Sequence, residues 1–254
     1  KVLYYNEVKN LKELKALIAP YIFSYDNLKL PKLNHDFKTI KLDVPSQKQH
    51  NHYMDQANML ISKSLNTALS RGEKLMIQAF LLRARQCCNS VELIDEKEAS
   101  SPKLEELASL VKQICVTQQD KVVIYSTWTT MLDIITRELG QKFALGTVRL
   151  DGSMSGSQRT RSLEQFKTDS DCRILLMSDA GSMGIDGLQV ACNNVIHVEL
   201  PWNPAKLDQR NGRLHRIGQT KSVDAYYIYS KGTIEEKIYT LLKEKKQVRL
   251  DTLF

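Results

Sequence analysis

Short, mostly apolar runs alternate with longer helical patterns through the second half of the chain. The apolar runs cover 121–126, 148–150, 172–177, 194–198 and 223–229. The stretches between them place apolar residues at helical spacing, as in 131–139 and 157–166. A strand with no polar face is buried on both sides, and such strands occur in parallel sheets whose connections are helices. The alternation therefore predicts an α/β fold, a parallel sheet with helices on both faces.

The first hundred residues have a different pattern. Helical spacing of apolar residues recurs over 8–22, 53–68 and 73–89. Between the first two of these stretches, 36–44 alternates apolar and polar residues as a strand does. We expect a mostly helical lead-in with one or two strands.

A helix start marks the predicted boundary between the two halves. Ser101 has the character of an N-cap, because Pro102 and acidic residues follow it. That helix should run to about residue 116. The predicted division is therefore a lead-in region over 1–100 and an α/β domain over 101–254.

Composition limits the compartment more than the function. Of the residues, 42% are hydrophobic and 26% charged, which is ordinary for a globular protein, and a net charge of +7 permits an anionic partner such as nucleic acid. The five cysteines form no C-x-x-C pair, which favours reduced thiols in an intracellular protein, nuclear in a eukaryote and otherwise cytoplasmic. No apolar run approaches the ~18 residues of a membrane span, so no membrane partner is expected. Since the sequence begins with Lys1, we expect a piece of a longer protein.

The stretch 201–219 concentrates positive charge. It reads P-W-N-P-A-K-L-D-Q-R-N-G-R-L-H-R-I-G-Q. Arginine presents a planar set of donors that matches phosphate oxygens. If the stretch is helical, Gln209, Arg213 and Arg216 share one face and form a phosphate-binding edge. The alternative is a solvated basic helix, which is how most charge runs are used.

Small polar residues follow three of the predicted strands. They lie in 126–128, 151–153 and 178–187, and the carboxyl ends of parallel strands meet at one edge, where ligands bind. Hydroxyls and glycine amides there can contact a nucleic-acid backbone. The predicted DNA-binding residues are Ser126, Thr127, Trp128, Gly152, Ser153, Ser178, Asp179, Trp202 and Asn203. The alternatives are ordinary turn residues and, for Trp128, packing in the core.

The motifs of this half resemble one family. Gln209-x-x-Gly212-Arg213-x-x-Arg216 is similar to the last signature of superfamily-two helicase-like ATPases, and the ending H-R-I-G-Q resembles that of Swi/Snf-type DNA translocases. K-V-V-I-Y-S-T-W and R-L-D-G-S-M-S-G-S-Q-R resemble the motifs numbered four and four-a. S-D-A-G-S-M-G-I-D-G-L-Q resembles motif five, but it departs from the usual A-G-G-x-G-L-N-L and is about two residues longer.

The resemblance implies a fold and a mechanism. The chain would be the second RecA-like lobe of a double-stranded DNA translocase, with Arg213 and Arg216 as arginine fingers and Gln209 coupling nucleotide to cleft closure. Gly184, Asp186 and Gly212 would contact nucleotide. No G-x-x-x-x-G-K-[ST] loop is present, so ATP and Mg²⁺ would be held mainly by a first lobe outside this chain, and the isolated chain should be inactive.

The expected partners are double-stranded DNA, the first RecA-like lobe, and a nucleosome or another DNA-bound protein. Two other functions stay open: a non-catalytic nucleic-acid-binding or regulatory module, and a strand-separating DNA or RNA helicase lobe. The H-R-I-G-Q ending favours the duplex translocase. His197, within an apolar run, is expected to be a core histidine, and His215 to have a structural or nucleotide-edge role. No metal-ligand set is predicted within the chain.

Overall fold

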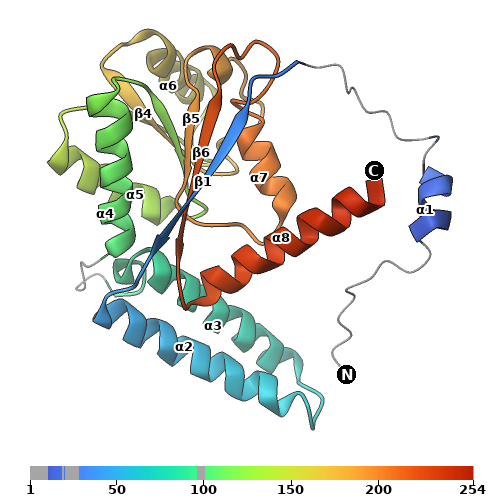
Figure 1. Cartoon of the computed structure of the whole chain (residues 1–254). Helices are drawn as coiled ribbons and strands as arrows, with labels where there is room; N and C mark the ends of the chain where they lie inside the picture. Colours follow the sequence, from blue (N-terminus) through green and yellow to red (C-terminus); the bar gives the residue numbers. More distant parts are fainter. Residues whose placement is uncertain (1–10, 19, 21–28, 96–100, 254) are drawn as a thin grey trace.

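A parallel sheet forms the centre of the protein. The computed structural model describes residues 11–18, 20, 29–95 and 101–253. The strands are β1 (Leu33–Ile40), β2 (Val122–Tyr125), β3 (Gly146–Leu150), β4 (Cys172–Met177), β5 (Asn194–His197) and β6 (Val223–Ser230). They lie in the order β1-β6-β5-β2-β4-β3 and are all parallel (Figure 1). The predicted RecA-like α/β fold is confirmed.

Helices cover both faces of the sheet, and each covered face has its own apolar core. One core packs α4 (Pro102–Val111) and α5 (Thr129–Lys142) against the sheet. The other core includes residues of α3 (Arg71–Asn89), α6 (Gly156–Thr168) and α8 (Ile234–Leu253). The four inner strands, β2, β4, β5 and β6, are buried along almost their whole length because helices cover both faces, as expected for a parallel sheet.

The helix predicted from Ser101 forms as expected. The Ser101 side chain accepts a hydrogen bond from the backbone N–H of Leu104, and Pro102 occupies the first turn. The helical backbone then continues beyond α4 through a π-helical turn, η3 (Lys112–Thr117). Short 3₁₀ turns form at η2 (Val91–Leu93) and η4 (Leu188–Val190).

The lead-in contributes the edge strand of the sheet. β1 pairs in parallel with β6, from Leu33 opposite Val223 onward. The predicted strand 36–44 is too long at its end, because Asp43 caps the N-terminus of α2 (Val44–Lys63). The two halves share one sheet, because β1 of the lead-in pairs with β6. The domain boundary at residue 100 stays a prediction.

Two helices of the lead-in form a hairpin. α2 and α3 lie beneath the sheet in Figure 1, and α3 begins with a capping box between Ser70 and Glu73. Of the helix predicted over 8–22, the described part is α1 (Leu11–Ile18); the rest lies outside the described residues.

One buried ammonium group, that of Lys103, links the lead-in to the rest of the fold. Lys103 of α4 lies 2.6 Å from Glu235 of α8, and both side chains are at most 1% exposed. Lys103 also donates a 2.7 Å hydrogen bond to Asn89 at the end of α3. Three helices thus meet at one ammonium group.

The five cysteines are all buried and unpaired, in agreement with the sequence. Burial raises the pKa of the Cys87, Cys115 and Cys192 thiols to about 12, so they are protonated and unreactive at neutral pH. No described helix combines the length and the apolar character needed to cross a bilayer.

Candidate functional site

The basic stretch 201–219 starts as a helix and then leaves it. α7 (Pro204–Asn211) begins at Asn203, whose side chain accepts a 3.0 Å hydrogen bond from the backbone N–H of Ala205. It ends at Gly212, the C-cap. Arg213 and Arg216 lie in the turns beyond it, so the prediction that they share a helical face with Gln209 is wrong. Glycine is a poor helix former, and the helix stops where it occurs.

A hollow of 250 Å³ lies beside α7 and is rich in polar groups. It is lined by Asp179, Ala180, Ser182, Met183, Lys206, Gln209, Arg210 and Arg213. Gln209 and Arg213, both predicted catalytic, are therefore brought together with Asp179, a predicted DNA-binding residue. Lysine and arginine side chains in its wall suit it to an anionic group such as a phosphate.

Arg210 is the buried cation of this hollow, and sequence reasoning treated it only as part of a basic run. Its side chain is 2% exposed, its Nε lies 2.7 Å from Asp179 Oδ1, and its guanidinium lies 5.2 Å from the centroid of the Tyr125 ring. Its Nη1 is buried and has no hydrogen-bond partner. Burial opposes ionisation of Asp179, but hydrogen bonding and charge from Arg210 and Lys206 hold the pKa of this carboxyl below its ordinary value.

The two predicted arginine fingers meet the loop that departs from the family pattern. Arg213 Nη1 donates to the carbonyl oxygen of Ile185 at 3.0 Å, and Arg216 Nη1 lies 2.8 Å from Asp186 Oδ1. The Arg216 and Asp186 side chains are 39% and 73% exposed. An exposed ion pair of this kind stabilises by only ~0–1 kcal/mol, so Arg216 can exchange Asp186 for another anion at little cost.

The glycines predicted to contact nucleotide lie in the same neighbourhood. Gly184 adopts a φ of 71°, which a residue with a side chain rarely does, and open space surrounds the position of its absent Cβ. Gly212 directly precedes Arg213, and a Cβ there would lie 3.0 Å from the carbonyl oxygen of Asp208.

The arginine segment, residues 213–216, leads away from the carboxyl edge of the sheet, whereas α7 lies at that edge with Arg210 against Asp179. After α7 the chain runs back toward the amino ends of the strands. His215 Nε2 lies 2.7 Å from the carbonyl oxygen of Pro31, which precedes β1, and Gln219 donates to that of Cys192, which precedes β5. Arg216 lies on this stretch, beside Asp186.

A buried carboxylate organises the loop after β2. Glu199 follows β5 and is 0% exposed. It accepts hydrogen bonds from the Ser126 hydroxyl at 3.2 Å, from the Thr127 backbone N–H, and from the Asn89 amide at 3.5 Å. Sequence reasoning missed Glu199; the available signal was a carboxylate at the end of an apolar run.

The other two strand-end loops also use their polar groups internally. Asp151 accepts hydrogen bonds from the Ser153 backbone N–H at 2.8 Å and from its hydroxyl at 2.5 Å. The Ser178 hydroxyl accepts a 3.0 Å hydrogen bond from the Gly181 N–H. Ser126 and Ser178 are buried. The predicted DNA-binding residues that are exposed are Thr127, Gly152, Ser153, Trp202 and Asn203.

His197 is a core histidine, as predicted. It is 0% exposed and stacks between the rings of Tyr125 and Tyr227, with centroids at 5.8 and 4.7 Å. Burial lowers its pKa to about 3, so the ring is neutral, and its Nε2 lies 2.8 Å from Asn211 Oδ1. Asn211 in turn donates to the Tyr227 hydroxyl at 2.8 Å, which also lies 2.9 Å from His35 Nδ1.

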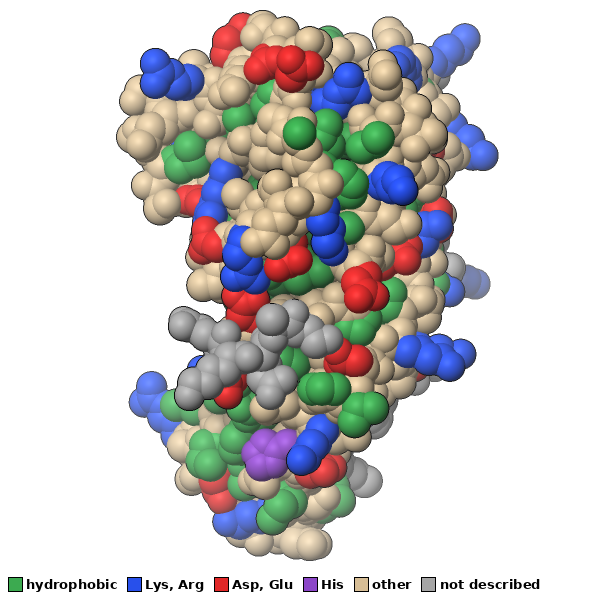
Figure 2. Space-filling model, turned by 90° about the vertical axis from the view of Figure 1, so that its left-hand side faces the viewer, with side chains coloured by type: hydrophobic (Ala, Val, Ile, Leu, Met, Phe, Trp, Pro, Cys, Tyr) green, Lys and Arg blue, Asp and Glu red, His purple; other side chains and the backbone are tan. Residues whose placement is uncertain are grey.

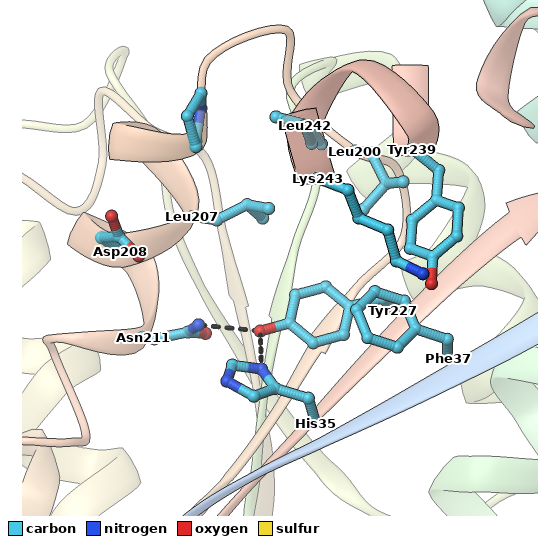
Figure 3. Close-up of a pocket in the computed structure, with 11 residues that line it drawn as sticks. His35, Phe37, Leu200, Leu207, Asp208, Asn211, Tyr227, Tyr239, Leu242 and Lys243 are labelled. Carbon is cyan, nitrogen blue, oxygen red and sulfur yellow. Dashed lines mark hydrogen bonds between the residues drawn. The ribbon is translucent and has the colours of Figure 1, made fainter. Parts of the chain in front are cut away.

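A second cavity lies on the opposite side of α7. Figure 3 shows Leu207 and Asn211 of α7 facing Tyr239 and Leu242 of α8 across this 240 Å³ pocket, with Tyr227 on its floor. Its lining is mostly apolar and includes none of the predicted site residues. Both cavities are lined by residues of α7. Gln209 faces the first cavity, and Leu207 and Asn211 project from the opposite side of the helix toward the second.

The surface charge of the protein is mixed where it can be seen. Figure 2 shows the side that is on the left in Figure 1, and basic and acidic side chains are interspersed over it. The net charge of +7 is not gathered on that face. Among the residues that the structure describes, no group of three or more His, Cys, Asp or Glu side chains is placed to hold a metal ion.

Together, the parallel sheet, the strand-end loops and the arginine segment define a RecA-like α/β lobe. Residues 102–218 match the helicase conserved C-terminal domain family. The ATP-dependent helicase FUN30 of Saccharomyces cerevisiae is 37% identical over 169 residues, which are 63% of this chain and 14% of that protein.

Two solved structures share the fold. The Sulfolobus solfataricus SWI2/SNF2 ATPase core in complex with dsDNA matches with a TM-score of 0.71 and 26% identity, over 93% of this chain and 50% of that chain. The C-terminal part of the Fun30 ATPase domain matches with a TM-score of 0.69 and 21% identity, over 88% and 97% of the two chains. These matches support a Snf2-type helicase C-terminal lobe.

Proposed function

We propose that this chain is the second motor lobe of an ATP-dependent double-stranded DNA translocase. In this proposal Arg213 and Arg216 act as arginine fingers on ATP held by a first lobe, Gln209 couples nucleotide to cleft closure, and the strand-end loops meet the duplex backbone. The observation that carries the proposal is the arginine segment itself: Arg213 lines a cation-rich hollow, and Arg216 is half-exposed and pairs with an exposed aspartate.

The loose pairing of Arg216 supports a role in catalysis. An arginine finger has to leave its resting partner and reach the phosphoryl group when the two lobes close. Arg216 meets that requirement because Asp186 is 73% exposed and holds it weakly. Arg210 does not meet it, since Asp179 and the Tyr125 ring hold its buried guanidinium. We therefore assign Arg210 to the architecture of the hollow.

ATP and Mg²⁺ fit this chain only in part. The hollow beside α7 offers cations for phosphate oxygens, and Arg210 Nη1 is a buried donor that still has no partner. Bound Mg²⁺ would neutralise the phosphate charge that develops during transfer. Its ligands, and the loop that holds the phosphates, are assigned to the first lobe. This chain matches 50% of the Sulfolobus core, and the proposed first lobe corresponds to the remainder of that core.

The proposed DNA contacts are the exposed residues of the carboxyl edge: Thr127, Gly152, Ser153, Trp202 and Asn203. A related core was solved with double-stranded DNA, which supports a duplex as the ligand. Backbone contacts carry no base information, so binding should be independent of sequence and should weaken steeply with added salt. The proposed substrate of the whole protein is a nucleosome or another protein bound to DNA.

The test is alanine at Arg216 in the full-length protein. We expect DNA-stimulated ATP hydrolysis to fall by about 10³-fold or more, with DNA binding nearly intact, because the lost group acts only on the transferred phosphoryl. Arg137→Ala is the matched control: Arg137 is 45% exposed and paired with Glu92, but it lies on α5. Unchanged turnover in Arg216→Ala contradicts the assignment and favours the non-catalytic module.

Two further measurements separate the remaining alternatives. The isolated chain is expected to show no ATP hydrolysis, because it holds half of the site; activity of pure material would place the phosphate-holding loop within this chain. Displacement of a triplex-forming strand without separation of duplex strands is expected from the full-length protein. Separation of the strands would identify an unwinding helicase instead.

A further inference from the structure

Arg85 lies between the only two tryptophans of the chain. It is on α3 and is 6% exposed. Its guanidinium carbon lies 5.1 Å from the centroid of the Trp128 ring and 5.5 Å from that of Trp202. Its Nη2 donates a 2.9 Å hydrogen bond to the carbonyl oxygen of Leu200. One side chain of the lead-in therefore contacts the loop after β2 and the loop after β5.

This arrangement requires arginine. A guanidinium is planar, so it can present its faces to aromatic rings and still donate a hydrogen bond from its edge, whereas a lysine ammonium is a compact charge on a flexible stem. The position is also costly. Arg85 is buried, its Nε has no hydrogen-bond partner, and within the described residues it forms no ion pair with a carboxylate. An apolar side chain of similar size would avoid that cost, so packing alone does not explain the arginine.

The two tryptophans differ in exposure. Trp128 packs against the core of the α4 and α5 face and is partly buried. Trp202 is 42% exposed, although its backbone carbonyl accepts a 3.2 Å hydrogen bond from Lys245 Nζ. A large aromatic side chain that is exposed yet held in place by a cation is typical of a recognition surface.

We propose that Arg85 is a positioning residue that holds Trp202 in the orientation in which it meets DNA. The inference rests on the proposed function, which places Trp202 in the duplex contact. Arg85 does not touch DNA itself, because it is buried beneath the two rings. The lead-in thus has a role in DNA engagement besides supplying the edge strand.

Intrinsic fluorescence reports the arrangement directly, because both tryptophans of the chain flank Arg85. Arg85→Lys is expected to shift the emission spectrum, since neither ring keeps the planar guanidinium over its face. Arg83→Lys is the matched control: the same change on the same helix, at an exposed arginine that hydrogen-bonds Gln86. Identical spectra for the wild type and Arg85→Lys overturn the proposal. Circular dichroism establishes that each variant is folded, and Arg85→Gln is measured alongside in case lysine disturbs the fold.

A double-mutant cycle on binding to a short duplex then separates positioning from a general structural effect. Trp202→Phe and Arg85→Lys are each expected to weaken duplex affinity about tenfold, and Arg83→Lys to leave it unchanged. If Arg85 acts through Trp202, the combined variant binds no more weakly than Trp202→Phe alone. Losses that add together overturn the positioning role.

The same cycle distinguishes the two levels of the argument. Normal affinity of Arg85→Lys beside weakened Trp202→Phe overturns the inference and leaves the proposed function standing. Normal affinity of Trp202→Phe itself overturns the DNA contact at Trp202, and the inference with it.

Discussion

The strand-end loops and the arginine segment are built in opposite ways. The strand-end loops are held by buried side chains. Glu199 bonds to Ser126, Arg85 lies against Trp202, and Arg210 pairs with Asp179. In the arginine segment, Arg216 is half-exposed and pairs with an exposed aspartate. A surface that tracks a regular duplex benefits from rigid contacts, whereas a group that reaches a nucleotide only when two lobes close has to be able to move. The difference is consistent with the proposal that the strand-end loops bind DNA and that the arginine segment moves toward the nucleotide when the lobes close.

The largest effect on the free energy of unfolding should come from the strand-end loops, which buried side chains hold in place. Glu199→Ala leaves the Ser126 hydroxyl, the Thr127 N–H and the Asn89 amide without their acceptor in a buried place. We expect the free energy of unfolding to fall by about 3 kcal/mol. Chemical denaturation of the purified chain measures this quantity.

The control for that experiment comes from the other region. Asp186→Ala removes an equally charged carboxylate whose partner is exposed, so the free energy of unfolding should change by less than about 1 kcal/mol. Equal losses in the two variants would show that the regions do not differ in rigidity as described.

A smaller effect, of about 1 kcal/mol, is expected from the ion pair between Asp179 and Arg210. The pKa of Asp179 is depressed in the folded protein, so its contribution is complete above the unfolded value near 3.8 and is lost as the pH falls through the lower folded value. Asp179→Asn should therefore be less stable than wild type at pH 7, and the difference should close on acidification below pH 4. Asp55→Asn, at an exposed position of α2, is the control. A difference that is independent of pH would contradict the role of this pair.

Local sequence rules predicted the fold well because its signals are local. Continuous apolar runs marked the central strands, and Ser101 with Pro102 marked the start of α4, since each depends only on neighbouring residues. The end of β1 was misplaced because alternation continued past Ile40, while Asp43 capped the next helix. The helix cap at Asp43 therefore determined where the strand ends, and the alternation of apolar residues did not.

The site was harder to predict because it depends on contacts between distant segments. The spacing of Gln209, Arg213 and Arg216 suggested one helical face, but α7 ends at Asn211, whose side chain bonds to His197 and Tyr227. The environments of Glu199 and Arg85 arise from segments far apart in the chain, so no local pattern reveals that either is buried. The opposition between braced loops and a loosely held arginine is a property of the folded protein.

The central claim is that one region grips DNA and the other completes the ATP site. It is tested most directly by steady-state ATP hydrolysis of the full-length protein as a function of duplex concentration, with Trp202→Phe and Arg216→Ala compared. The account predicts that Trp202→Phe raises the duplex concentration for half-maximal rate and keeps kcat, while Arg216→Ala loses kcat and binds duplex normally. If both variants change the same parameter, the division of the lobe into a gripping and a switching region is wrong.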